Sequence, residues 1–287
     1  MAFSFSFDIK DGSVQPQQPA VVEINADEED FVAIPPSVVS DDIVETSKAA
    51  VVETEASEFP ALRRRCQQNV IAALKGDATV EASLLEAISL ESDVLDRRYE
   101  GGLKTWECAV DLCKYLQATA HTFHAGISVL ELGCGHALPS IFMAKSVRLE
   151  SLTLQDYNLA VIRHVTIPNL AANGVSIDAT VKFIHGDWRG LGTVLGRGGK
   201  FDVILASETI YRPESYGLMA DIIAGSLKGE GGRALIAAKD YYFGLEGTVG
   251  QFVSFVNSRH AQYHLEARIV HRTNEHVARS IVQIERK

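Results

Sequence analysis

From residue 101 onward, short apolar runs alternate with longer stretches in which apolar residues recur every three or four positions. The short runs predict strands and the longer stretches predict amphipathic helices. Five strands alternating with helices indicate a parallel sheet covered on both faces, and two late strands without a helix between them indicate an antiparallel edge pair. The expected strands are 128–132, 152–155, 180–184, 201–206, 234–238, 264–270 and 280–284, and the expected helices are 141–147, 160–172, 216–227 and 249–259.

The pattern is different before residue 101. Residues 1–58 are rich in Pro, Gln, Ser and acidic residues and lack periodicity, which predicts a disordered leader. Residues 59–100 follow a helical pattern, around 62–74 and again around 80–90, and predict an N-terminal helical extension. Residues 101–287 are expected to form one α/β domain with a Rossmann-like sheet of seven strands, mostly parallel, with the antiparallel pair at one edge.

The leader carries the charge imbalance of the chain. It holds thirteen acidic and two basic residues, so it accounts for the formal net charge of −10, and the remainder is nearly neutral. Such a segment repels nucleic acid, and it either recruits basic partners such as ribosomal proteins or stays solvated. Within it Phe3, Phe5 and Phe7 alternate with Ser, a pattern typical of a short strand that adds to an edge or binds a partner.

Composition narrows the class of protein further. The chain has no apolar run of 18 residues and no secretory start, so we expect a protein inside the cell, cytoplasmic and nuclear, without a membrane span. Its four cysteines show no CxxC spacing and no pairing with a histidine cluster, which argues against zinc and against a disulfide framework. We expect a monomer that needs no metal and has no nucleic-acid site.

The sharpest local motif is VLELGCGHALPS, residues 129–140. An apolar strand ends in Glu131, and Gly133 and Gly135 follow, then a helix with Pro139 in its first turn, where proline is tolerated. The two glycines let the backbone turn tightly and approach a ligand that a Cβ would exclude. A bare GxG is weak by itself, so its meaning depends on the strand before it, the helix after it and the acid in the next strand.

That acid is Asp156, at the end of the second strand and about 20 residues after the glycines, where a carboxylate accepts two hydrogen bonds from a ribose diol. The alternative is a strand-end Asp that caps the next helix. After the third strand, Asp187 is placed to accept from an adenine amine and Trp188 to form an apolar wall, unless Trp188 belongs to the core. A dinucleotide site is disfavoured, because its third glycine is replaced by Ala137 and because the sheet ends in an antiparallel pair.

The fourth strand ends in Ser207-Glu208-Thr209-Ile210-Tyr211, at the edge of the sheet where α/β proteins bind their ligands. A carboxylate there could accept an N–H from a substrate ring, such as a neutral imidazole with one bare nitrogen and one N–H, fix its tautomer and stabilise a cation that forms on it. Glu208 is the candidate for this role, and Tyr211 could orient the ring by its face or its hydroxyl. The alternative is that Glu208 pairs with Arg212 and that Tyr211 is simply packed.

The sequence resembles a specific group, the protein-histidine N-methyltransferases of class I that modify a large-subunit ribosomal protein. The likeness covers nearly the whole chain apart from the leader and part of residues 59–98. It is carried by MAFSFSFDI at the start, YEGGLKTWECAVDL (99–112), VLELGCG, QDYN, IPNLAAN (167–173), FDVILASETIYRPESY (201–216) and AAKDYYFGLEGTVGQF (237–252).

The resemblance implies S-adenosyl-L-methionine as the methyl donor and a histidine, at its tele-nitrogen, as the acceptor. One departure is Ala137, where relatives tend to have glycine. We expect alanine to be tolerated less well than glycine at this position, without loss of donor binding. Glu208 and Tyr211 are the expected catalytic residues. The expected cofactor-binding residues are Trp106, Glu107, Glu131, Gly133, Gly135, Asp156, Tyr157, Asn158, Asp187, Trp188 and Ser207.

Three alternatives stay open at this stage. A lysine methyltransferase of the same fold would need a deprotonated amine held by aromatic or acidic side chains. A methyltransferase fold could serve as a ribosome-assembly binding module without turnover. A small-molecule substrate is also compatible with the sequence.

Residues 241–244 read YYFG and are followed by Gly247 and Gly250, which predicts a loop that either grips a peptide or packs on the sheet edge. His136 is expected at the start of a helix.

Overall fold

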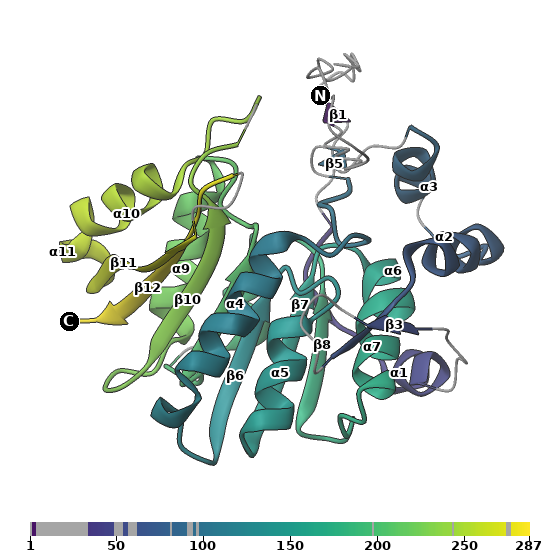
Figure 1. The fold of residues 1–287 in the computed structure, drawn as a ribbon, viewed down its shortest axis with the longest axis horizontal. Coiled ribbons are helices and arrows are strands. Elements are labelled where there is room, and N and C mark those ends of the chain that lie inside the picture. The colour runs from purple at the N-terminus through teal and green to yellow at the C-terminus, as the bar shows by residue number, and fades with distance from the viewer. Residues whose placement is uncertain are drawn as a thin grey trace.

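The computed structural model describes residues 2–3, 34–48, 54–56, 62–80, 82–90, 94–95, 98–196, 198–242, 244–273 and 277–287. In this part of the chain a central sheet is flanked by helices on both faces (Figure 1). The strands of that sheet are β2 (Ser37–Val38), β6 (Ile127–Leu132), β7 (Leu149–Asp156), β8 (Val181–His185), β9 (Val203–Ser207), β10 (Arg233–Lys239), β11 (Leu265–Thr273) and β12 (Arg279–Arg286).

The order of the eight strands is β11-β12-β10-β9-β6-β7-β8-β2. The five strands from β10 to β8 are parallel, and β12 pairs antiparallel with both β10 and β11. The seven expected strands and the antiparallel edge pair are therefore confirmed, and the fold is the Rossmann-like sheet of class I methyltransferases. All six residues of β6 are buried, as expected for the central strand of a parallel sheet with helices on both faces.

Two hydrophobic clusters fill the space between the sheet and its helices. One contains buried residues of α4, α5 and α7, and the other contains buried residues of α8, α9 and α10, so these two sets of helices cover opposite faces. The helices are α4 (Glu107–Ala118), α5 (Leu138–Ser146), α6 (Leu159–Val161), α7 (Ile167–Ala172), α8 (Leu191–Leu195), α9 (Ser215–Ser226), α10 (Val249–Ser258) and α11 (His260–Tyr263), and a short 3-10 turn, η2 (Ala120–Thr122), follows α4.

The helix expected over 160–172 is interrupted. A π-helical turn, η3 (Ile162–Thr166), separates α6 from α7. Pro168 has no N–H to donate to the preceding turn, and this missing hydrogen bond explains the local change of register. The turn has a structural use, because the hydroxyl of Thr166 donates to the carbonyl of Gly135 over 2.7 Å.

The N-terminal helical extension is confirmed in part. Its helices are α2 (Gln67–Gly76) and α3 (Ala82–Ser89), and they form a third hydrophobic cluster with residues of α6 and η3. Residues Arg63–Arg65, expected within the first helix, instead form strand β4, which pairs with β3 (Thr54–Ala56). The backbone of β1 (Ala2–Phe3) pairs antiparallel with β5 (Val94–Leu95), whereas Phe5 and Phe7 lie outside the described residues.

Part of the leader differs from the expected disorder. Strand β2 pairs antiparallel with β8 and adds an eighth strand to the sheet, and α1 (Asp41–Lys48) follows it. Val39 is 5% exposed, and Ile43 and Val44 pack against the main core, so a few apolar residues anchor this segment. Most of the leader lies outside the described residues. No helix in the described part of the chain is long and apolar enough to cross a membrane.

Candidate active site

A cleft of about 2230 Å³, open to solvent, runs along the carboxyl ends of β6, β7, β8 and β9. This is the edge at which open α/β sheets bind their ligands, because the strand order reverses there. Ten of the thirteen expected site residues line this cleft. These ten are Trp106, Gly133, Gly135, Asp156, Tyr157, Asp187, Trp188, Ser207, Glu208 and Tyr211.

The glycine turn after β6 forms the floor of the cleft. Gly133 and Gly135 have φ angles of 62° and 46°, in the left-handed region that favours glycine. A Cβ on Gly133 would lie 2.9 Å from the Cγ2 of Thr209, and one on Gly135 would lie 3.3 Å from the carbonyl oxygen of Gly102. Ala137 also has a positive φ, 55°, which costs a residue with a Cβ about 1 kcal/mol. The structure thus gives a physical reason for a glycine preference at that position.

Asp156 lies in the wall of the cleft at the end of β7 and is 4% exposed. Its carboxylate accepts hydrogen bonds from the backbone N–H groups of Gly135, over 2.9 Å, and Asn158, over 3.2 Å. Burial raises its pKa to about 6, although these backbone hydrogen bonds oppose the rise. Because a carboxylate has about four lone-pair sites, Asp156 can still accept from a diol while it braces the glycine turn.

The far end of the cleft is built around Trp188. Its indole N–H donates to the side-chain oxygen of Gln155 over 2.8 Å, and the same oxygen accepts from the backbone of Gly133 over 3.3 Å. Asp187 forms an ion pair with Arg189 over 2.7 Å, and its backbone N–H donates to the carbonyl of Ile34 over 2.8 Å. A segment of the leader therefore contacts the backbone at this end of the cleft.

The residues present fit S-adenosyl-L-methionine. The buried hydroxyl oxygens of Thr105 and Thr209 line the cleft and have no hydrogen-bond partner in the described part of the chain. Unsatisfied buried polar groups are costly unless a ligand pairs with them. The glycine turn leaves room for a close backbone approach, Asp156 offers acceptors for hydroxyl groups, and Trp188 offers an apolar surface.

Three expected cofactor residues do not line the cleft. Glu131 is fully buried behind the glycine turn, where it accepts from the backbone N–H of Ser140 over 3.0 Å, and burial raises its pKa to about 8. The side chain of Asn158 is buried and donates to the carbonyl of Arg98 over 2.9 Å. Glu107 begins α4 with its side chain 52% exposed. We assign the first two a role in positioning the backbone around the cleft.

Glu208 follows β9 in the left-handed conformation, with a φ of 55°, which is uncommon for a residue with a Cβ. One carboxylate oxygen accepts from the hydroxyl of Tyr242. The other lies 3.5 Å from Nζ of Lys239, too far for a good charge-assisted hydrogen bond, and accepts none from the described residues. The side chain is 7% exposed, so this oxygen is a buried acceptor with free capacity.

The alternative pairing of Glu208 with Arg212 is not what the structure has. Arg212 instead pairs with Glu100 over 3.2 Å, and the hydroxyl of Tyr211 also donates to Glu100. Tyr211 is therefore held by its hydroxyl, which leaves the face of its ring rather than its O–H for a substrate. His136 is buried before α5 and contacts the carbonyl of Leu103 over 3.2 Å, and burial lowers its pKa to about 4.

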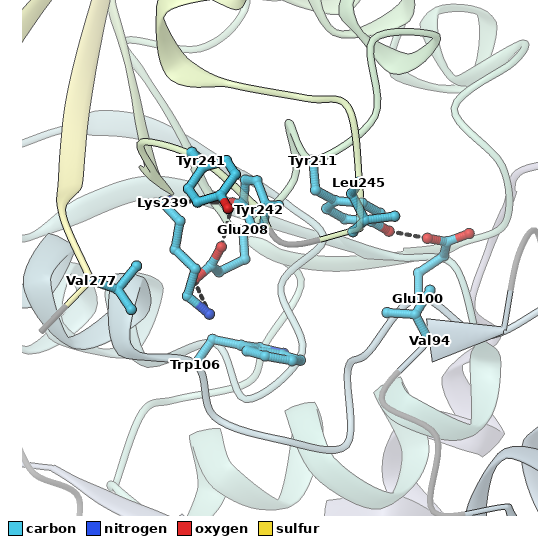
Figure 2. Close-up of a pocket in the computed structure, with 10 residues that line it drawn as sticks. All are labelled: Val94, Glu100, Trp106, Glu208, Tyr211, Lys239, Tyr241, Tyr242, Leu245 and Val277. Carbon is cyan, nitrogen blue, oxygen red and sulfur yellow. Dashed lines mark hydrogen bonds and ion pairs between the residues drawn. The ribbon is translucent and has the colours of Figure 1, made fainter. Parts of the chain in front are cut away.

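Beside the cleft lies a second, smaller pocket, here called the aromatic pocket (Figure 2). Glu208 and Tyr211 line both cavities, so the two meet at these side chains. Tyr241 is half exposed at 51%, whereas Tyr242 is buried. The pocket is lined by Val94, Glu100, Trp106, Glu208, Tyr211, Lys239, Tyr241, Tyr242, Leu245 and Val277.

Four residues that hold other side chains of the site in place, Gln155, Glu100, Lys239 and Tyr242, were not among the expected site residues. Gln155 and Glu100 lie in segments that carry the family resemblance, QDYN and YEGG, but nothing in their spacing indicates that one holds Trp188 and the other Tyr211. Lys239 and Tyr242 belong to the KDYYFG segment, where strand β10 ends. Their contacts with Glu208 join β10 to β9, and such a contact between strands has no signal in a single sequence.

Taken together, the two cavities can bring a donor group and an acceptor ring to one buried carboxylate. The cleft offers hydroxyl acceptors and an apolar wall, and the pocket offers aromatic faces around Glu208. No cluster of three or more His, Cys, Asp or Glu side chains that could hold a metal ion occurs in the described part of the chain. This arrangement suits group transfer to a planar, apolar-faced acceptor with an N–H to donate.

Comparison with known proteins gives a consistent family. A family model described as lysine methyltransferase matches residues 88–243. The histidine protein methyltransferase 1 homolog of Dictyostelium discoideum is 38% identical over 162 residues, which are 56% of this chain and 50% of that protein. The homolog of Bos taurus is 33% identical, covering 74% of this chain and 62% of that protein. Histidine protein methyltransferase 1 of Saccharomyces cerevisiae is 30% identical, covering 67% of this chain and 66% of that protein.

The chain thus spans between half and two thirds of the length of these curated relatives. The family model names lysine and the relatives name histidine, so the two agree on methyl transfer to a protein and differ in the acceptor. The glycine turn and the residues matched by the family model both indicate a methyltransferase. The chain belongs to the methyltransferase family that this model describes, and it is similar to curated proteins that are named histidine protein methyltransferases.

Proposed function

We propose that the protein is an S-adenosyl-L-methionine-dependent protein-histidine N-methyltransferase. The observation that carries the proposal is the buried acceptor oxygen of Glu208, at the junction of the cleft and the aromatic pocket. The names of the curated relatives support histidine as the acceptor. The resemblance of the sequence to enzymes that modify a large-subunit ribosomal protein supports such a protein as the substrate, in the cytoplasm or nucleus.

When bound, S-adenosyl-L-methionine supplies an electrophilic methyl group. The chain supplies orientation and electrostatics. Glu208 accepts the N–H of the substrate imidazole, which fixes the tautomer and leaves the other ring nitrogen with its lone pair directed away from the carboxylate. The family resemblance supports the tele-nitrogen, Nε2, as the acceptor, and Glu208 then accepts the N–H of Nδ1. As the ring becomes cationic, the same carboxylate stabilises it.

The other side chains around Glu208 hold it in place and exclude water. Tyr242 donates to one carboxylate oxygen and fixes the rotamer, and the second oxygen keeps its capacity to accept a hydrogen bond. Trp106 and Tyr211 place aromatic faces on the pocket wall, which suits a flat ring. No strong base is needed, because an imidazole with a pKa of about 6.5 is largely neutral at pH 7.

Methyl transfer from radiolabelled donor into a lysate that lacks this enzyme tests the proposal. After acid hydrolysis, the labelled amino acid identifies the acceptor. We expect tele-methylhistidine in one protein of the large ribosomal subunit. Methyllysine would instead support the acceptor named by the family model, and a chain that fails to bind the donor in calorimetry would support a binding module without turnover.

A further inference from the structure

A lysine of the chain itself lines the aromatic pocket. Nζ of Lys239, the last residue of β10, lies 3.5 Å from Glu208 and 3.6 Å from Glu107. It also lies 4.9 Å from the centre of the Trp106 ring, and its side chain is only 17% exposed. In Figure 2 its amino group points between Glu208 and Trp106.

We propose that Lys239 is a specificity-determining residue, which admits a neutral imidazole to the aromatic pocket and excludes the ammonium of a lysine. This inference rests on the proposed function, because it concerns which acceptor reaches Glu208. It assigns Lys239 a positioning role on the acceptor side rather than a part in the methyl transfer itself.

The charge balance of the pocket leads to this inference. Glu208 would attract an ammonium if it stood alone, but Lys239 already neutralises it at 3.5 Å. Burial of Lys239 favours its neutral amine, yet the carboxylates of Glu208 and Glu107 outweigh burial, and its pKa is raised, so it stays charged. A substrate ammonium would therefore lose its hydration without gaining a free counter-ion. Two like charges about 5 Å apart in a partly buried site weaken binding by of the order of 10²-fold.

The hydrogen-bonding capacity of Glu208 suits a neutral donor. Its oxygen nearest Lys239 accepts no hydrogen bond from the described residues, so one N–H can be accepted there without disturbing the ion pair. A neutral imidazole brings one N–H and no net charge. The aromatic side chains of Trp106 and Tyr211 line the pocket and offer apolar surface to the ring. The pocket is thus complementary to imidazole in charge, in donor count and in shape.

The test uses the full chain and synthetic peptides copied around the histidine that the labelling experiment identifies. Three peptides carry histidine, lysine or norleucine at the acceptor position, and norleucine matches lysine without its charge. Inhibition constants of the lysine and norleucine peptides are measured against methylation of the histidine peptide. In the wild-type protein we expect the lysine peptide to bind at least about 10-fold more weakly than the norleucine peptide. Equal binding of the two would overturn the proposal without any variant.

Lys239→Met removes the charge and Lys239→Arg retains it. For Lys239→Met we expect the lysine peptide to bind at least about 10-fold more tightly than to the wild type, and for Lys239→Arg we expect the wild-type preference. Lys104→Met is the matched control, because Lys104 lies 4.6 Å from the same Trp106 ring but lines the cleft and not the pocket. Lys239→Gln serves if Lys239→Met does not fold, as judged by thermal melting and donor binding.

The outcomes separate this inference from the proposed function. Methylhistidine from the wild type together with an unchanged peptide preference in the neutral variants would overturn the role of Lys239 and leave the function intact. A change of the same size in Lys104→Met would also overturn it, because the effect would then not depend on the pocket. Methyllysine from the wild-type protein would overturn both.

Discussion

Replacing Glu208 by glutamine removes one charge and keeps the shape of the side chain. The backbone at this position is in the left-handed region, with a φ of 55°, and both residues have the same Cβ, so the strain is unchanged. The amide oxygen can still accept one hydrogen bond. What is lost is the negative charge beside a ring that becomes cationic during methylation, so we expect the effect on the chemical step and not on donor binding.

The size of the loss follows from the geometry. A carboxylate about 4 Å from a full positive charge, at an effective dielectric constant of about 20, contributes about 4 kcal/mol. Lys239 lies 3.5 Å from this side chain and stays in the variant, so its own effect on the ring cancels in the comparison. Because the ring carries only part of a full charge in the transition state, a loss of about 3 kcal/mol is reasonable. A barrier raised by about 3 kcal/mol lowers kcat by about 10²-fold.

Single-turnover methyl transfer to the histidine peptide measures kcat, and calorimetry measures the affinity for S-adenosyl-L-methionine. Glu107→Gln is the matched control, because Glu107 lies 3.6 Å from the same lysine but its side chain is 52% exposed and screened by solvent. We expect that variant to change kcat by less than about 3-fold. The reasoning is refuted if Glu208→Gln keeps kcat within that range, or if its donor affinity falls as far as its kcat.

Three further predictions concern the cleft and its supports. Burial raises the pKa of Asp156 to about 6, so donor affinity in calorimetry should fall about 10-fold per pH unit below pH 6, and Asp156→Asn should be weak at every pH. Gly186 has a φ of 114°, and a Cβ added there would lie 2.7 Å from Pro35. Gly186→Ala should therefore lower the free energy of unfolding by about 2–4 kcal/mol. Gly192→Ala is the control, because a Cβ there meets open space. Burial raises the pKa of Glu131 to about 8. Between pH 4.5 and pH 8 the folded state therefore binds more protons than the unfolded state. The free energy of unfolding should fall by up to about 1.4 kcal/mol per pH unit as the pH rises through this range. Denaturant unfolding of Glu131→Gln should lack this slope, and a parallel slope in the variant would contradict the assignment.

Periodicity alone determined the main sheet of this protein. Parallel strands buried on both faces are nearly continuous apolar runs, and the helices between them repeat every three or four residues, so both are visible in a single sequence. The motif around Gly133 and the acid at Asp156 were equally visible, because a glycine turn and a strand-end carboxylate are local features. Features that depend only on neighbouring residues can therefore be predicted from a sequence pattern.

The leader shows where such reasoning stops. Its composition predicts disorder, yet Ser37–Val38 pairs with β8 and Val39 is buried. A two-residue strand has no period to detect, and its stability comes from an edge that another part of the chain provides. The π-helical turn before Pro168 is a similar case, because the proline is visible but the way in which the helix absorbs it is decided by packing.

The same distinction between local and tertiary features applies to the candidate site. The sequence by itself determined that Glu208 ends a strand and that Asp156 follows a glycine motif, since these are facts of order along the chain. Only the tertiary structure decided that Glu208 meets Lys239 and Tyr242, that Arg212 pairs with Glu100 instead, and that Glu131 lies buried behind the cleft. The physical reason is that charge pairing and burial depend on distances between strands, which the order of residues along one chain does not contain.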